Sequence, residues 1–288
     1  MSQEIELKVA LGPQGPEALR HHPRLAGLVP RLATLGNTYF DTPGGDLEAA
    51  RMALRLRRVD GRLLQTLKTR GQGGGGLSRR GEWEWEVPGP GLDLEGLAAL
   101  PPMAELGHAL LARLVPRFAT DFRRETWRIE SGDARIELAL DLGEIRAEGR
   151  TVAIRELELE LEAGEPAALQ DLAEELAESV PLRPADTSKA ARGGALLAGH
   201  WQLPEGGSAD AWLHRAVVAL DALDDTGDPA WRERAREALA RLAGLEEGRY
   251  RREAEALAAA LDAPDWPTPA FGRLALRLAR RLPADAEL

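Results

Sequence analysis

The chain has 288 residues, of which 44% are hydrophobic and 29% are charged, a composition that fits a folded protein of about two domains and excludes a disordered or fibrous chain. Its net charge of −10, from 37 basic and 47 acidic residues, argues against nucleic acid or an acidic membrane surface as a partner. The absence of cysteine excludes disulfides, a thiol nucleophile and cysteine-bound zinc. With no leader pattern and no apolar run of about 18 residues, we expect a soluble, cytoplasmic protein.

Segments in which charged and apolar residues alternate run through residues 1–200, and this period of two is typical of β-strands. Helical patterns with a spacing of three to four residues lie between them, and the last of these has an apolar stripe. In chain order the expected elements are strand 4–8, helix 15–28, strands 39–41, 53–57, 63–69, 80–87, helix 104–115, strands 122–129, 134–141, 154–161 and helix 165–180.

Residues 208–282 contain only helical patterns, dominated by leucine, alanine and arginine. The preceding segment 203–208 has the composition of a linker, and Ser208 or Asp210 suits the N-cap of the next helix. We therefore expect one domain over residues 1–200 and a helical bundle over residues 207–288. The glycine-rich stretch 71–76 lacks the Gly-Lys-Ser/Thr of a P-loop and is interpreted as a hairpin connection.

The charged strand faces allow two arrangements. In an open antiparallel sheet the charges would face water, whereas in a closed eight-stranded barrel they would line an interior that holds one small ligand. We favour the barrel because charges of each sign are clustered, and buried clusters need compensation. A phosphate chain would balance the basic cluster, and Mg²⁺ or Mn²⁺ suits the oxygen-only acidic cluster. Only three of the 37 basic residues are lysines, Lys8, Lys68 and Lys189, which marks them as candidates for sites that need a compact ammonium.

The N-terminal segment Glu4-x-Glu6-x-Lys8 resembles the ExExK motif of the CYTH superfamily, the triphosphate tunnel metalloenzymes. Further matches follow in that family's order, at residues 39–42, 54–57, 68, 80–84, 124, 141, 156–160 and 188–189. The resemblance covers about residues 1–200. It implies an α+β fold, an eight-stranded antiparallel tunnel barrel with flanking helices, followed here by an all-α helical domain.

The resemblance also implies roles for individual residues. Glu4, Glu6 and Lys8 would be catalytic, with Lys8 orienting or deprotonating the attacking water. One or two Mg²⁺ or Mn²⁺ ions would be bound by Glu4, Glu6, Glu156, Glu158, Glu160 and Asp141. The phosphates would be bound by Lys8, Arg55, Arg57, Lys68, Arg80, Arg124 and Lys189, and Glu82 and Glu84 match two further tunnel acids.

The implied reaction is hydrolysis of tripolyphosphate to pyrophosphate and phosphate. Thiamine triphosphate hydrolysis and conversion of ATP to cyclic AMP are alternatives, because a tunnel recognises the phosphate tail. A different alternative is a non-catalytic polyphosphate-binding protein, which would lack the metal carboxylates. Bacterial relatives often carry a helical CHAD domain associated with polyphosphate binding; the shorter tail here is either a truncated module of that kind or a bundle that covers or dimerises the barrel.

Overall fold

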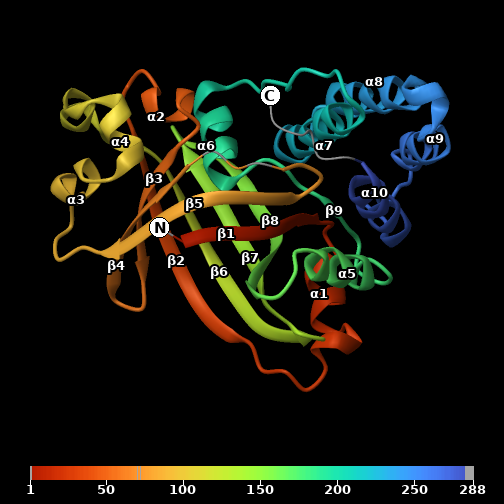
Figure 1. The fold of residues 1–288 in the computed structure, drawn as a ribbon, viewed down its shortest axis with the longest axis horizontal. Coiled ribbons are helices and arrows are strands. Elements are labelled where there is room, and N and C mark those ends of the chain that lie inside the picture. Colours follow the sequence, from red (N-terminus) through yellow and green to blue (C-terminus); the bar gives the residue numbers. More distant parts are fainter. Residues whose placement is uncertain (1, 70, 72, 283–288) are drawn as a thin grey trace.

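The structure is a computed structural model that describes residues 2–69, 71 and 73–282 of the chain. Eight strands form a closed antiparallel barrel (Figure 1), because β5 and β8 both pair with β1 and complete the circle. The order around the barrel is β1, β5, β4, β3, β2, β6, β7, β8. The strands are β1 Ser2–Leu11, β2 Arg31–Asp41, β3 Ala53–Val59, β4 Arg62–Lys68, β5 Leu77–Glu86, β6 Val115–Ser131, β7 Ala134–Ala147 and β8 Arg150–Ala163. The expected antiparallel barrel is confirmed.

Several strands are longer than the charge alternation predicts. The expected strand 39–41 is only the end of β2, whose 11 residues pair with β6 from Arg31 opposite Thr126 to Asp41 opposite Val115. The first half of β2 lacks alternating charges, so its strand conformation depends on pairing with a distant segment. A short strand that the sequence pattern missed, β9 Leu182–Pro184, pairs with the end of β1.

The helices that cover the barrel are short. The expected helix 15–28 is divided into α1 Gly15–Arg20 and the 3₁₀ turn Pro23–Leu25, because His22 precedes a proline and is extended. The expected helix 104–115 is divided by Gly107, at φ 80°, into α4 Pro101–Leu106 and the 3₁₀ turn His108–Arg113. Helix 165–180 is confirmed as α5 Ala167–Leu176. The helices α2 Asp46–Ala49, α3 Leu94–Ala98 and α6 Lys189–Ala198 had no predicted counterpart.

The apolar faces of the strands point out of the barrel and pack against these helices. Leu138 and Leu157 form one buried cluster with Leu169 and Leu172 of α5. On another side of the barrel, Leu54 and Leu67 pack with Leu47 of α2 and Leu97 of α3. This burial is what leaves the opposite, charged faces of the same strands for the interior.

One level of the interior is apolar. Leu35, Phe122 and Ile154 lie on the same strand faces as the interior charges, and they form a buried cluster that Leu196 of α6 packs against. The interior of the barrel is therefore not polar along its whole length: this apolar layer interrupts the charged side chains.

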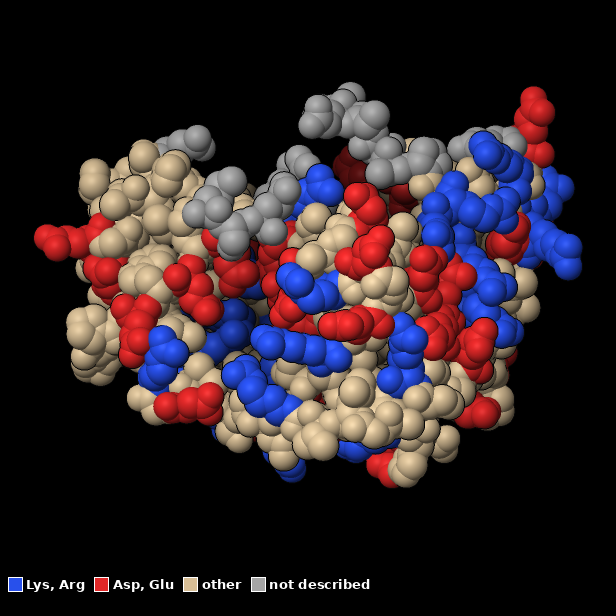
Figure 2. All heavy atoms as spheres, turned by 60° about the horizontal axis from the view of Figure 1, so that its bottom comes forward, with Lys and Arg blue, Asp and Glu red and all other residues tan. Residues whose placement is uncertain are grey.

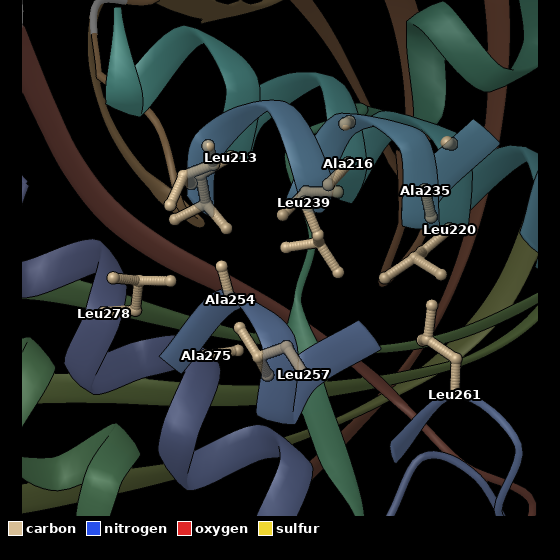
Figure 3. Packing of buried hydrophobic residues seen from close by; sticks show 14 of the residues in the cluster. Leu213, Ala216, Leu220, Ala235, Leu239, Ala254, Leu257, Leu261, Ala275 and Leu278 are labelled. Carbon is tan, nitrogen blue, oxygen red and sulfur yellow. The ribbon is translucent and has the colours of Figure 1, made fainter. Parts of the chain in front are cut away.

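The C-terminal helices have a core of their own (Figure 3), in which Leu213, Leu239, Leu257 and Leu278 lie in one buried cluster. This region comprises α7 Ala209–Thr226, α8 Ala230–Gly244, the 3₁₀ turn Glu246–Gly248, α9 Arg251–Ala260 and α10 Pro269–Arg281. The Ser208 side chain caps α7. Residues 283–288 of the expected bundle and Gln72 of the glycine-rich stretch lie outside the described residues.

The helical region is packed onto the barrel rather than tethered to it. Leu276 of α10 belongs to the apolar cluster outside the barrel, and Arg277 Nε lies 3.0 Å from Glu174 Oε2 of α5. Helix α10 also lies beside β9, the strand that pairs with the end of β1 (Figure 1). Among the helices formed by the described residues, none combines the length and the apolar character that crossing a membrane would need.

Candidate functional site

Antiparallel register places charged residues of neighbouring strands side by side inside the barrel. Glu4 lies opposite Arg80 and Lys68 opposite Glu82. Across the next strand pair, Lys8 lies opposite Glu158. Side chains two residues apart on a strand share a face, so these pairs stack in layers along one bore.

The bore is part of a cavity of about 1910 Å³ that extends to α7 and α10. Figure 2 shows acidic and basic side chains interspersed over one face of the molecule, with basic side chains gathered on the side of the C-terminal helices. Two of the predicted site residues, Asp141 and Glu156, lie behind the cavity wall and are 0% and 3% exposed. The predicted site residues that line the cavity are Glu4, Glu6, Lys8, Arg55, Arg57, Lys68, Arg80, Glu82, Glu84, Arg124, Glu158, Glu160 and Lys189.

One wall of the cavity is a network of four charges from β1, β4 and β5. Lys68 Nζ donates to both carboxylate oxygens of Glu4 at 2.9 Å, and Arg80 Nε donates to Glu4 Oε2 at 2.8 Å. Arg80 Nη2 also donates to Glu6 Oε1 at 2.7 Å, so that one guanidinium links both glutamates. Burial alone would raise the pKa of Glu4, but Lys68 and Arg80 outweigh it and lower that pKa to about 2.

A second cluster lies deeper and belongs to β6, β7, β8 and α6. Arg124 donates to the two oxygens of Asp141 at 2.6 Å each and to Glu158 Oε2 at 2.5 Å. Lys189 Nζ lies 2.7 Å from Asp141 Oδ2 and 2.9 Å from Glu158 Oε1, and it also contacts Glu156. Burial lowers the pKa of Lys189, but the surrounding carboxylates raise it well above its ordinary value. Lys189 is therefore an internal cation of this cluster.

Three cations of the predicted site have no carboxylate partner among the described residues. Among the described residues, Lys8, Arg55 and Arg57 form no salt bridge, although Lys8 is 5% and Arg55 9% exposed. They donate instead to neutral oxygens: Lys8 Nζ to the Thr187 carbonyl at 2.9 Å, Arg55 Nε to Thr66 Oγ1 at 3.3 Å and Arg57 Nε to Asn37 Oδ1 at 3.0 Å. Burial, and then repulsion from Arg55 and Arg124, lowers the pKa of Arg57 to about 10.

Acidic side chains of β1 and β8 lie close together in the cavity. Glu6 lies opposite Glu160 in the register, and burial is the largest cause that raises the pKa of both. For Glu160, burial and the nearby Glu4 carboxylate raise the pKa to about 7. A cation bound between these acids would relieve both the desolvation and the repulsion.

The donor set fits a hard divalent cation, because Glu4, Glu6, Glu158 and Glu160 offer only carboxylate oxygens to the cavity. The group of acids whose oxygens all lie within 4.8 Å of one another, among the described residues, is a different one: Asp141, Glu156 and Glu158. Asp141 and Glu156 of that group are buried behind the cavity wall and are already balanced by Lys189, so the acids that line the cavity fit an ion better.

Sequence reasoning missed several polar residues of the site. Asn37 and Thr66 hold Arg57 and Arg55 and carry no charge that the strand pattern would show. Arg192 follows Lys189 on α6, and its Nη1 lies 3.4 Å from Glu156 Oε2 while its Nε lies 3.0 Å from Asp225 Oδ2. Arg192 lies one helical turn after Lys189, and this spacing could have indicated that both side chains reach the same acidic cluster.

The fold and cavity define a closed barrel that presents acidic and basic side chains to one charged bore. The sequence model of the CYTH domain family matches residues 2–193, and the chain belongs to this family. The inorganic triphosphatase of Haemophilus influenzae is 38% identical over 195 residues, which are 67% of this chain and 54% of that protein. The chain thus spans about half the length of this curated relative.

A solved structure has the same fold. The HpAC1 protein of Hippeastrum, described as a suspected adenylyl cyclase with a dominant triphosphatase activity, superposes with a TM-score of 0.52 and 22% sequence identity. The match covers 69% of this chain and 97% of that chain. The match to the family model ends at residue 193, so α7 to α10 lie outside it.

Proposed function

We propose that this chain is a metal-dependent triphosphatase that hydrolyses tripolyphosphate to pyrophosphate and phosphate inside the charged bore. The observation that carries the proposal is the presence of two buried cations, Lys8 and Arg55, and a half-buried one, Arg57, without a carboxylate partner among the described residues. Buried cations of this kind need an anion, and a row of them suits the oxygens of a linear phosphate. The similarity to an inorganic triphosphatase supports the same substrate class.

The proposed binding mode follows from the position of these cations. Arg55 and Arg57 lie two residues apart on β3, on one strand face, and would bind successive phosphates. Lys68 and Arg80 are held by Glu4 and Glu6, so they are preoriented toward the same cavity. As charge develops on the leaving oxygens, these donors would stabilise it without further reorganisation.

The acids would supply the metal site. We propose that Glu4, Glu6, Glu158 and Glu160 hold one or two Mg²⁺ or Mn²⁺ ions, while Asp141 and Glu156 keep Lys189 and Arg124 in place. A bound ion would polarise phosphate oxygens and lower the pKa of a coordinated water. Lys8 would orient the attacking water, since it lines the cavity and lies opposite Glu158 in the strand register. The tunnel acids Glu82 and Glu84 hold Lys68 and Thr66 respectively.

The other parts of the proposal concern partners and place. The basic side chains of α8, α9 and α10 support polyphosphate as a further ligand of residues 207–288, treated as a second domain. A homodimer through this bundle is the alternative role for the same helices. The cysteine-free composition supports the cytoplasm as the compartment.

The test is phosphate release from tripolyphosphate, thiamine triphosphate and ATP, each with Mg²⁺, Mn²⁺ or EDTA. We expect tripolyphosphate to be cleaved fastest, only with a divalent ion, and Arg57→Met to reduce release by at least about 100-fold. The matched control is Arg128→Met, since Arg128 lies on the same face of β6 as Arg124 but is 80% exposed and outside the cavity. Binding without release under every condition would contradict the proposal.

A further inference from the structure

Three aspartates on one face of α7 point at the barrel. Asp221, Asp224 and Asp225 are spaced three and four residues apart, a pattern that usually forms a solvated acidic face. Here Asp221 is 5% exposed and lies against β9 and the segment that follows it. This face therefore joins the helical region to the tunnel domain.

The two oxygens of Asp221 have separate partners. Its Oδ1 accepts a hydrogen bond from Arg183 Nη1 at 2.6 Å. Its Oδ2 accepts the backbone N–H groups of Asp186 at 3.2 Å and of Thr187 at 2.9 Å. One buried carboxylate thus fixes the orientation of two consecutive peptide groups.

These peptide groups belong to the segment that holds Lys8. The carbonyl of Thr187 accepts the Lys8 ammonium at 2.9 Å, and the N–H of Ala185 donates to the Lys8 carbonyl at 3.1 Å. Two residues after Thr187 comes Lys189, the first residue of α6. The segment 185–189 therefore places two of the three lysines of the chain, and a residue of the helical region fixes its conformation.

The hydrogen bonds that the Asp221 carboxylate accepts from the Asp186 and Thr187 N–H groups can be distinguished from its contact with Arg183, which joins the two regions. Arg183 is 1% exposed and has further acceptors in Asp224 and in the Leu220 carbonyl, at 3.2 Å for the latter. Without the Asp221 carboxylate, Arg183 keeps these partners. The N–H groups of Asp186 and Thr187, in contrast, lose this acceptor.

We infer that Asp221 is a positioning residue of the tunnel, which sets the place of the Lys8 ammonium through the 185–187 segment and so makes the helical region part of the active machinery. The inference rests on the proposed triphosphatase function for its effect on turnover. Its structural half, the placement of Lys8, is independent of that function.

The composition of the chain offers a direct readout. With only three lysines, labelling with ¹³Cε-lysine gives three side-chain resonances, which the Lys8→Met, Lys68→Met and Lys189→Met variants assign. In Asp221→Ala we expect the Lys8 resonance to move and the Lys68 resonance to stay, since Lys68 is held by Glu4 and Glu82. We expect kcat for tripolyphosphate to fall roughly 10- to 100-fold with KM changed less than about threefold.

The control for a general loss of stability is Leu257→Ala, which opens a cavity in the helical core on α9 without touching the 185–187 segment. We expect it to lower the unfolding temperature while leaving the Lys8 resonance and kcat unchanged. Unmoved lysine resonances in Asp221→Ala, or an equal loss of kcat in Leu257→Ala, would overturn the inference. If Asp221→Ala does not fold, Asp221→Asn, which keeps one acceptor oxygen, is measured in its place. If the wild type does not hydrolyse tripolyphosphate but the Lys8 resonance moves in Asp221→Ala, the result would contradict the proposed function and leave the placement of Lys8 by Asp221 supported.

Discussion

Lys189 Nζ lies 2.7 Å from Asp141 Oδ2, and both residues are withdrawn from solvent, at 6% and 0% side-chain exposure. Asp141, Glu156 and Glu158 offer oxygens within 4.8 Å of one another, so this ammonium stands where a metal ion would otherwise be needed. The pair distinguishes Asp141 and Glu156, which are buried behind the cavity wall around Lys189, from the acids that line the cavity, with which the sequence motif had grouped them.

Removing this cation should therefore destabilise the fold. In Lys189→Met three buried or half-buried carboxylates, Asp141, Glu156 and Glu158, lose a cation that they share, and breaking a buried ion pair costs about 3–5 kcal/mol. At about 2–4 °C per kcal/mol for a chain of this size, we expect the unfolding temperature to fall by roughly 6–20 °C. Thermal unfolding followed by circular dichroism measures the change. Lys68→Met is the control, because Lys68 is 16% exposed and should cost clearly less; equal losses would contradict this reading of Lys189.

Divalent ions should stabilise the wild type through the cavity acids. An ion at 100 times its Kd stabilises the native state by about 2.7 kcal/mol, which corresponds to roughly 5–10 °C in unfolding temperature. We expect this shift with Mn²⁺ or Mg²⁺, its reversal by EDTA, and its loss in Glu6→Gln. Differential scanning fluorimetry with Glu86→Gln as control is suitable, since Glu86 is paired with Arg62 on the surface. If Mn²⁺ or Mg²⁺ raised the unfolding temperature of Glu6→Gln as much as that of the wild type, Glu6 would not be a ligand of the ion.

The barrel was predictable because period-two alternation is a local property of each strand. Parity in the segments around Glu4, Arg55 and Arg124 suffices to place their side chains on one face, and barrel closure then brings the faces together. The alternation does not predict which acids line the cavity and which lie behind its wall. Asp141 lies behind the wall, where it contacts Arg124 of β6 and Lys189 of α6.

The elements that sequence reasoning missed depend on long-range contacts. The first half of β2 is a strand because β6 pairs with it, and β9 is a strand because β1 does. The aspartates of α7 look like a solvated face until Arg183 and Arg192 are placed against them. In each case the deciding partner lies more than 30 residues away, beyond any local pattern.

The ion pair between His214 and Asp186 should make stability depend on pH. Burial lowers the pKa of His214, but the hydrogen bond and charge of Asp186 outweigh it and raise that pKa above 6.5, with Asp221 and Asp210 acting in the same direction. The pKa of Asp186 is lowered, burial being opposed by His214, the Gly76 N–H and Lys8, so its carboxylate stays ionised near neutral pH.

A raised histidine pKa contributes stability that is complete below the unfolded value, about 6.5, and is lost as the pH rises through the folded value. The stability difference between wild type and His214→Gln should therefore be largest near pH 6 and smallest near pH 9. Urea unfolding across this range measures it, with His21→Gln as control because His21 is 74% exposed. A difference that grows with pH would show that the sign is wrong.

Lys8 should behave in the opposite way to Lys189. Its ammonium has one acceptor, the Thr187 carbonyl, and no carboxylate partner among the described residues, so Lys8→Met removes one hydrogen bond, worth about 1 kcal/mol. The methionine side chain retains most of the apolar stem. Turnover, in contrast, should fall by at least about 100-fold, the usual cost of losing a donor aimed at developing charge. Phosphate release and thermal unfolding, measured on the same preparations, compare the two variants. Lys8→Met is expected to lose activity with little loss of stability, and Lys189→Met is expected to show a clear loss of stability. A Lys8→Met variant that is strongly destabilised yet active would mean that Lys8 is a structural cation and that the anion site lies with Arg55 and Arg57 alone.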